Sequence, residues 1–167
     1  TSLATPLGVK RVNIESARDM LAASQAALPA DVAVLVAAVA DWRPAKPPNT
    51  KIKKTKSALA DIALAENPDI LATLSKPGKK RPKLVIGFAA ETDNVEANAR
   101  AKITKKGCDW IVANDVSGDV MGGAENQVML ITKSGAETWP RMDKAAVARK
   151  LAQEIARKLT AKSPNRK

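Results

Sequence analysis

The hydrophobic positions of the chain fall into short apolar runs separated by amphipathic stretches. The run from Asp31 to Ala40 (DVAVLVAAVA) is apolar without alternation, which is typical of a central parallel strand covered on both faces. The segments Lys83 to Ala90 and Asp109 to Asn114 have the same character and predict two more buried strands. An earlier run, Val9 to Ile14, predicts a further short strand. The first two thirds of the chain therefore supply the strands of a sheet.

Helical segments alternate with these strands. Ser16 is expected to cap a helix over residues 16–28. Asn67-Pro68-Asp69 predicts a second helix start, with Asn67 as the N-cap, Pro68 at the first helical position and a helix end near residue 75. Asp93 and Glu96 have the spacing of a capping box and predict a third helix that ends at residues 106–107. Strands and helices in alternation indicate a parallel sheet with helical crossovers.

The last third of the chain shows a different pattern. After a glycine-containing loop at residues 118–123, Gln127 to Lys133 alternates as a half-buried strand does, and Ala136 to Pro140 is its expected antiparallel partner. A final amphipathic helix is predicted by four apolar residues spaced four apart: Val147, Leu151, Ile155 and Leu159. We therefore expect an α/β, Rossmann-like three-layer fold with a mostly parallel sheet and a C-terminal antiparallel strand pair. One domain over residues 1–159 and a frayed basic tail at 160–167 are expected.

Function is expected at one edge of this sheet. In open parallel sheets, ligands bind outside the carboxyl ends of the strands. The residues at those ends are 38–41, 89–92 and 113–115. The proline-rich segment Asp41 to Thr50 follows the first of them and predicts a stiff exposed loop, and a short β segment is expected at residues 62–64.

Composition removes several mechanisms. The 167 residues include no histidine and no tyrosine, and Cys108 is the only cysteine. Catalytic triads that need histidine, His-ligated zinc or haem, and internal disulfides are therefore excluded within this chain. The hydrophobic fraction of 45% includes 31 alanines, and such small side chains suit close packing of helices on a sheet. Chemistry must depend on lysine, arginine, carboxylates, amides, backbone N–H groups and bound ions.

The net charge of +11 is concentrated in two blocks. Residues 51–83 carry nine basic and three acidic side chains, and residues 143–167 carry eight and two. Such a balance suggests a nucleic-acid-binding module as one hypothesis. Three tryptophans and one phenylalanine make a poor stacking platform for single strands, however, and a small polyanionic substrate needs only a few cations.

Membrane and export signals are not visible in the sequence. The longest apolar run, Val32 to Ala40, is far shorter than the ~20 residues of a membrane span. The first ten residues contain no apolar segment of the kind found in signal peptides. With a single cysteine as well, the cytoplasm is the expected location.

Five sequence blocks occur together in one order. They are AAVADWRP (37–44), KIKK (51–54), NPDIL (67–71), GFAAET (87–92) and GCDWIVAND (107–115). In this order the chain resembles the phosphopantothenate–cysteine ligase (phosphopantothenoylcysteine synthetase) family of the bacterial, CTP-dependent type. The resemblance covers essentially the whole chain.

The resemblance implies an activity. Members of this family join phosphopantothenate to cysteine in coenzyme A biosynthesis: CTP activates the carboxylate as an acyl-cytidylate, and the cysteine amine then displaces CMP. Mg²⁺ accompanies the triphosphate. The resemblance further implies a homodimer and an N-terminal flavin-dependent decarboxylase domain in the full-length protein, with no flavin in this part and no nucleic-acid or membrane partner. Transfer of a nucleotidyl group depends mainly on positioning and on cations, so the absence of histidine is compatible with it.

The resemblance also implies site residues. Lys51 is expected to be catalytic, by stabilising the charge of the triphosphate, and residues 43–50 to form a flap over the reacting acid. Ala38 and Asn114 are expected to contact the acyl substrate, Asp115 to line the same crevice, and the metal ligands are not assigned. The nucleotide is expected to contact Ala37, Asp41, Lys51, Pro68, Asp69, Ile70, Leu71, Phe88, Lys102 and Lys106.

Each of these positions also has a plain structural interpretation. Lys51 lies in a lysine run that could be a solvated edge strand, and Asp41 could simply end a strand. Phe88 could be ordinary core, and Lys102 and Lys106 could form a solvated helix face. Cys108 is expected to be inert packing.

The chain departs from the family in one respect. Family members carry an upstream strand, a glycine-rich phosphate-binding turn and an Asn/Ser-rich segment, and this sequence begins after them. We therefore expect a C-terminal fragment that retains much of the nucleotide site. A dinucleotide-dependent oxidoreductase, a third hypothesis, is disfavoured because no G-x-G-x-x-G turn is found.

Overall fold

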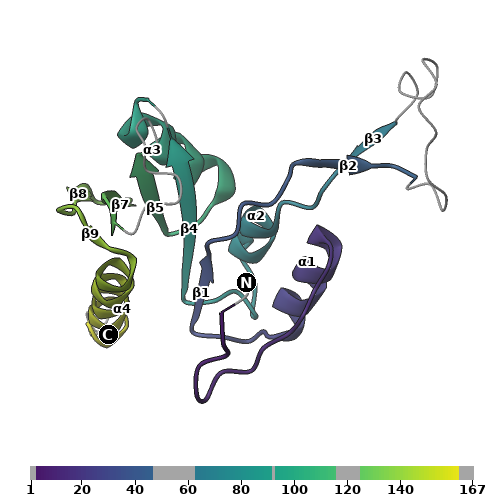
Figure 1. The fold of residues 1–167 in the computed structure, drawn as a ribbon, viewed down its shortest axis with the longest axis horizontal. Helices are drawn as coiled ribbons and strands as arrows, with labels where there is room; N and C mark the ends of the chain where they lie inside the picture. Colours follow the sequence, from purple (N-terminus) through teal and green to yellow (C-terminus); the bar gives the residue numbers. More distant parts are fainter. Residues whose placement is uncertain (1–2, 47–62, 92, 116–124, 162–167) are drawn as a thin grey trace, which may run out of the picture.

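A mixed sheet with helices on both faces forms the body of the protein (Figure 1). The computed structural model describes residues 3–46, 63–91, 93–115 and 125–161. The helices are α1 (Ala17–Ala26), α2 (Ile70–Ser75), α3 (Val95–Lys106) and α4 (Lys144–Thr160). The strands are β1 (Val32–Leu35), β2 (Trp42–Pro44), β3 (Leu64–Glu66), β4 (Leu84–Glu91), β5 (Trp110–Asp115), β6 (Glu125–Asn126), β7 (Val128–Thr132), β8 (Ala136–Thr138) and β9 (Met142–Asp143).

The main sheet has five strands in the order β1-β4-β5-β7-β8. Strands β1, β4 and β5 run parallel, and β7 and β8 continue the sheet as an antiparallel pair. The predicted fold class, a mostly parallel Rossmann-like sheet with a C-terminal antiparallel pair, is confirmed. Two further two-stranded ladders, β2-β3 and β6-β9, lie outside it.

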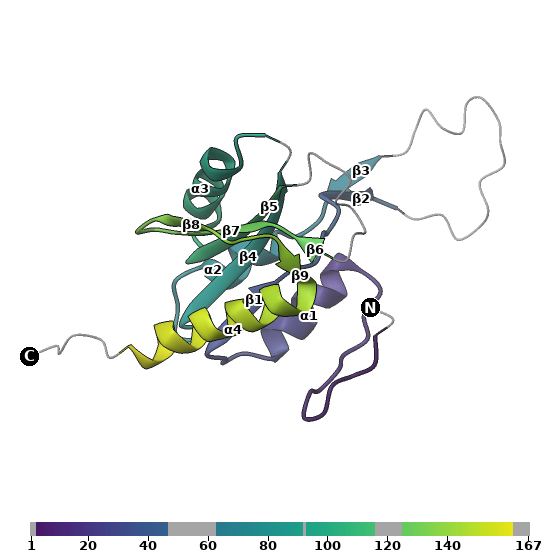
Figure 2. The ribbon, with the colours of Figure 1, turned by 60° about the vertical axis from the view of Figure 1, so that its left-hand side comes forward.

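Alternate residues of the central strands face opposite helical layers. Leu84 and Ile86 of β4 belong to a buried cluster with Val147 and Leu151 of α4. Val85, between them in sequence, belongs to the other cluster, which contains Ala99 and Ile103 of α3. In Figure 2, α4 lies across the near side of the sheet. Strands covered on both faces explain why β4 and β5 are apolar without alternation.

The first two predicted strands differ from expectation. Residues 9–14 are neither helix nor strand, and their side chains are exposed. The apolar run 31–40 forms a strand only over β1, and β1 is an edge of the sheet, with Val34 and Val36 exposed by 44% and 61%. The prediction of a central strand there was wrong, because among the described residues only β4 pairs with β1.

Helix boundaries depend on caps that the sequence identified only in part. Ser16 caps α1 in a capping box with Asp19, as expected for its start. The expected N-cap of α2 was wrong by two residues, since Asp69 takes that position. For α3 the expected capping box is absent, because Asn94, with a positive φ of 44°, occupies the N-cap without a side-chain hydrogen bond. Gly107 ends α3 in the left-handed conformation, with a φ of 72°.

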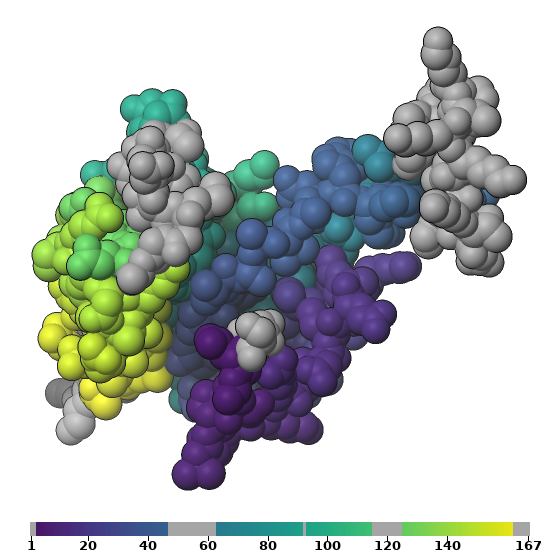
Figure 3. All heavy atoms as spheres, viewed as in Figure 1, coloured from purple at the N-terminus to yellow at the C-terminus, as the bar shows by residue number. Residues whose placement is uncertain are grey.

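An antiparallel ribbon projects from the body. Strands β2 and β3 pair from Trp42 opposite Glu66 to Pro44 opposite Leu64, and the ribbon stands away from the sheet in Figure 3. The predicted strand at 62–64 is thus shifted toward Glu66. The prediction of a loop over residues 41–50 was wrong for Trp42 to Pro44, which form β2; Pro44 is tolerated there because β2 pairs with β3 on one side only. Residues 47–50 of that segment lie outside the described ranges.

Candidate functional site

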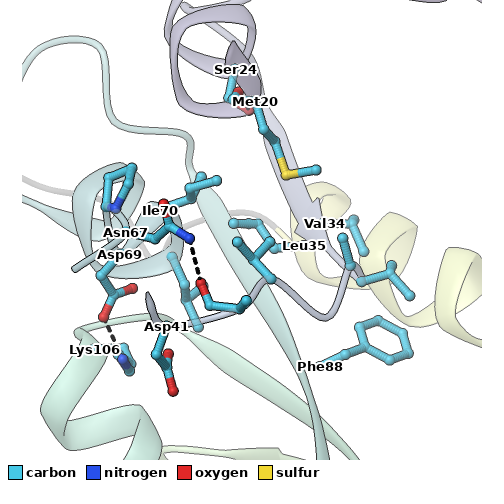
Figure 4. Close-up of a pocket in the computed structure, with 16 residues that line it drawn as sticks. Met20, Ser24, Val34, Leu35, Asp41, Asn67, Asp69, Ile70, Phe88 and Lys106 are labelled. Atoms are coloured by element: carbon cyan, nitrogen blue, oxygen red, sulfur yellow. Dashed lines mark hydrogen bonds and ion pairs between the residues drawn. The ribbon is translucent and has the colours of Figure 1, made fainter. Parts of the chain in front are cut away.

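A cavity of about 430 Å³ opens where the chain leaves β1 (Figure 4). Its wall is built from α1, β1 and the segment after it, α2 with the residues before it, Phe88 of β4 and Lys106 of α3. The lining includes apolar residues such as Leu35 and Met20 and the acidic residues Asp41 and Asp69. The cavity lies at the carboxyl end of a parallel strand, where the sequence predicts a ligand.

Asn67 holds the segment that carries Asp41. Its side-chain Nδ2 donates to the carbonyl oxygen of Ala40 at 2.8 Å, and its backbone N–H donates to that of Asp41 at 2.7 Å. The guanidinium of Arg43 donates to the carbonyl oxygen of Glu66 on the opposite strand. These bonds fix the path of residues 40–43 beside α2. Asn67 is therefore a tether between segments, a role that the sequence analysis missed because it assigned Asn67 to helix capping.

Asp69 makes two contacts at the cavity wall. Its carboxylate accepts a hydrogen bond from the backbone N–H of Ala72 at 2.9 Å, which caps α2, and it pairs with the Nζ of Lys106. Burial opposes ionisation of Asp69, but the hydrogen bonds from Lys106 and Ala72 outweigh it and hold the pKa below its ordinary value. Asp69 is therefore an anchored anion beside a cation, both in the same wall.

A second ion pair lies one turn away on α3. The Nζ of Lys102 is 3.0 Å from Oε1 of Glu91, the last residue of β4. The Glu91 side chain is 15% exposed and that of Lys102 37%. Lys102 and Lys106 thus share a face of α3, and each meets a carboxylate from another element. Lys102 is not among the residues that line the cavity.

Gly87 allows α2 to approach the sheet. A Cβ at this position would lie 2.6 Å from Cδ2 of Leu71 and 2.9 Å from Cδ1 of Ile111, both shorter than a van der Waals contact. Glycine in the middle of β4 therefore admits the Leu71 side chain, and with it the start of α2 that forms the cavity wall.

A second, mainly apolar cavity of about 630 Å³ lies between the sheet and α4. It shares Val34, Val36, Ala37 and Phe88 with the first cavity. Asn114 and Asn126 line it, and the Oδ1 atom of each is buried and has no hydrogen-bond partner among the residues that the structure describes. Asn126 carries no sequence signal beyond its position before an alternating strand.

The structure brings most of the sequence-predicted residues to these two cavities. Ala38 and Asn114 line the second cavity, whereas Lys102 lies outside both and Lys51 lies outside the described residues. Only the strand assignment of Asp115 is described. The first cavity is lined by Ala37, Asp41, Pro68, Asp69, Ile70, Leu71, Phe88 and Lys106.

The chemistry available here is binding and charge stabilisation. Within the described ranges, no group of three or more acidic or cysteine side chains could hold a metal ion. The Cys108 thiol is buried, and burial raises its pKa, so it is a poor nucleophile. Among the helices of the described segments, none is long and apolar enough to cross a membrane. A cavity of this volume with anchored charges suits a small polar ligand.

Comparison with known proteins gives consistent matches. A family model described as the DNA/pantothenate metabolism flavoprotein C-terminal domain matches residues 1–159. The coenzyme A biosynthesis bifunctional protein CoaBC of Vibrio vulnificus (strain YJ016) is 40% identical over 158 residues, covering 92% of this chain and 39% of that protein. CoaBC of Escherichia coli (strain K12) is 40% identical over 159 residues, with the same coverage.

A solved structure matches the fold as well. The C-terminal domain of a coenzyme A biosynthesis bifunctional protein CoaBC superposes with a TM-score of 0.71 and 36% identity, covering 97% of this chain and 74% of that one. The chain therefore spans about two fifths of the length of the curated relatives it matches.

Proposed function

The chain belongs to the family of DNA/pantothenate metabolism flavoprotein C-terminal domains, and from this we propose that it forms the CTP site of a phosphopantothenate–cysteine ligase in coenzyme A biosynthesis. One observation carries the proposal. The residues that the resemblance assigns to the nucleotide are spread from Ala37 to Lys106 in sequence, yet most of them line one cavity. Lys102 does not line this cavity, and Lys51 lies outside the described residues.

The proposed reaction has two steps. A carboxylate oxygen of phosphopantothenate attacks the α-phosphorus of CTP, and pyrophosphate leaves with the electrons of the broken P–O bond. The amine of cysteine then attacks the acyl carbon of the acyl-cytidylate, CMP leaves, and the amine gives up a proton. Both steps move negative charge onto phosphate oxygens, and neither requires histidine.

Lysine side chains supply the stabilisation in this proposal. The Lys106 ammonium, held in the cavity wall by Asp69, is assigned to the phosphates, together with Lys102 and Lys51. Phe88 and the backbone at Ala37 are assigned to the cytidine moiety. Residues 43–50 are assigned to a flap that excludes water from the activated acid.

The acyl substrate is assigned to the second cavity. Ala38 and Asn114 are there, and this cavity shares a wall with the first that is formed by Val34, Val36, Ala37 and Phe88. Phosphopantothenate in the second cavity would then lie next to CTP in the first, so that its carboxylate could reach the α-phosphate. The amide oxygen of Asn114, which has no partner within the described ranges, could accept a hydrogen bond from the hydroxyl or amide of the substrate.

Mg²⁺ is proposed to enter with the triphosphate. In such sites the ion is held by substrate phosphates, waters and one or two carboxylates. Asp41 offers a carboxylate at the cavity, and no cluster of acids for a separate ion exists in the described part of the chain. When bound, the ion would neutralise phosphate charge.

The larger context is also a proposal. The curated relatives are bifunctional proteins, of which this chain corresponds to a part. We propose that the full-length protein contains an N-terminal flavin-dependent decarboxylase domain. We also propose that it forms a homodimer and is located in the cytoplasm.

Isothermal titration calorimetry tests the nucleotide site. We expect CTP with Mg²⁺ to bind more tightly than ATP, and Lys106→Met to weaken CTP binding. The matched control is Lys158→Met, which removes the same charge from the exposed end of α4. Equal, salt-sensitive binding of CTP, ATP and inorganic triphosphate would refute the proposal, because it would indicate a general attraction of polyanions.

A further inference from the structure

Two lysines on one face of α3 are each held by a carboxylate from a different element. Lys106 pairs with Asp69 at the start of α2, and Lys102 pairs with Glu91 at the end of β4. The two lysines are four residues apart, hence neighbours on the helix surface. Asp69 belongs to the cavity already described. Glu91 has no assigned role.

Glu91 is held more firmly than a surface acid. Its Oε1 lies 3.0 Å from Lys102 Nζ, and its Oε2 accepts a hydrogen bond from Nδ2 of Asn98 at 3.4 Å. The same Nδ2 donates to the carbonyl oxygen of Asp93 at 3.0 Å, which ties Asn98 to the turn before α3. The Glu91 side chain is 15% exposed, against 49% for Glu96, which pairs with Arg100 on the same helix. Screening by water is therefore weaker at the Glu91 pair.

We propose that Glu91 is a positioning residue that holds the Lys102 ammonium ready for the triphosphate of the nucleotide. The inference rests on the proposed CTP site. An ammonium has three donors, so a hydrogen bond to Glu91 leaves two for phosphate oxygens. The Lys102 side chain is still 37% exposed, so the pair with Glu91 does not bury it. A lysine side chain loses much rotamer entropy when it is ordered. The pair with Glu91 orders Lys102 already in the nucleotide-free protein, so nucleotide binding does not have to order it.

A simple counter-charge would act in the opposite direction. Glu91 also repels phosphate, so if it did nothing but neutralise Lys102, its removal would tighten nucleotide binding. If it positions Lys102, its removal weakens binding. The sign of the change in CTP affinity therefore separates the two roles.

The experiment is a double-mutant cycle on CTP binding by calorimetry. Glu91→Gln should raise the Kd for CTP about threefold to tenfold, through loss of order in one lysine side chain. In the Lys102→Met background the same substitution should change the Kd less than twofold, because a positioning residue acts only through its lysine. Glu96→Gln is the control: it removes the same charge from α3 and should leave the Kd unchanged. Circular dichroism checks that each variant is folded.

Each outcome decides the proposal. An unchanged or lower Kd for Glu91→Gln overturns it, and so does an equal weakening in the Lys102→Met background, which would indicate a purely structural role. Should Glu91→Gln fail to fold, Glu91→Asp, which keeps the charge but shortens its reach, should weaken CTP binding in the same way. If the unmodified protein binds no CTP, the proposed function itself fails. If only the positioning role of Glu91 fails, the unmodified protein still binds CTP tightly, and Lys102→Met still weakens that binding.

Discussion

Substitutions of Asp69 separate its two contacts. Asp69→Ala removes both the cap of α2 and the ion pair with Lys106, whereas Asp69→Asn keeps an amide oxygen that can accept from the N–H of Ala72. Loss of an N-cap side chain to alanine costs about 1 kcal/mol. The ion pair is partly exposed, with side-chain exposures of 25% for Lys106 and 42% for Asp69, so its loss costs about 0.5 kcal/mol.

These values predict an order of stabilities. Asp69→Ala should lower the free energy of unfolding by about 1.5 kcal/mol, and Asp69→Asn by about 0.5 kcal/mol. Lys106→Met, which loses the ion pair but keeps the cap, should resemble Asp69→Asn. Urea denaturation followed by circular dichroism measures all three. If Asp69→Asn is as destabilising as Asp69→Ala, the cap contributes nothing and the reasoning is refuted.

The pH dependence gives an independent check. The pKa of Asp69 in the folded protein lies below its ordinary value of 3.8, so the folded state favours the ionised form. The stability from this shift is present above that ordinary value and is lost as the pH falls through the lower pKa of the folded state. The difference between the unmodified protein and Asp69→Asn should therefore shrink in that acidic window. A difference that grows on acidification would contradict the assignment.

Three further substitutions or reactions test the packing around the site. Gly87→Ala should destabilise the protein by about 1–3 kcal/mol in urea denaturation, since its Cβ would lie 2.6 Å from Cδ2 of Leu71 and 2.9 Å from Cδ1 of the buried Ile111; a neutral result would show that these side chains move aside without cost and that glycine is not required there. Asp109→Ala should cost about 1–3 kcal/mol in the same assay, because it leaves the N–H of Val85 without this acceptor and removes the ion pair of Arg81, which keeps only backbone carbonyl oxygens as partners; an effect below about 0.5 kcal/mol would contradict this. Cys108 should react with a thiol reagent at pH 8 much more slowly in the folded than in the urea-unfolded protein, because it is buried and burial raises the thiol pKa; equal rates would disprove its inertness.

The apolar pattern of the sequence predicted the strands correctly where an apolar segment lies in the middle of the sheet. Lys83 to Ala90 and Asp109 to Asn114 correspond to β4 and β5, which have neighbours on both sides. The run from Asp31 to Ala40 is just as apolar, yet β1 ends at Leu35 and lies at the sheet edge. An apolar pattern shows that a segment can be buried, but not which segments cover it.

Local capping rules were less decisive. Asn67 and Asp69 are both good N-cap residues, and the rule cannot choose between neighbours. The choice depends on a distant contact, because the Asn67 side chain bonds to the carbonyl oxygen of Ala40 and leaves Asp69 to cap α2. The same limitation applies to Glu91, whose partner Lys102 becomes visible only when β4 and α3 are packed together.

The resemblance to a known family named half of the residues that line the first cavity, but not the contacts that hold them. Asp69 and Lys106 were both expected to contact the nucleotide, and the structure shows them paired with each other. Their role toward CTP stays a prediction, as does that of Lys51, which lies outside the described residues.

A crystal structure of the protein soaked with CTP and Mg²⁺ tests the central claim most directly. The account predicts nucleotide density in the cavity of about 430 Å³, in contact with Asp41 and Phe88 and with phosphates beside Lys106. Density for the nucleotide on the basic face of α4, or an empty cavity in a crystal whose protein binds CTP in solution, would contradict it.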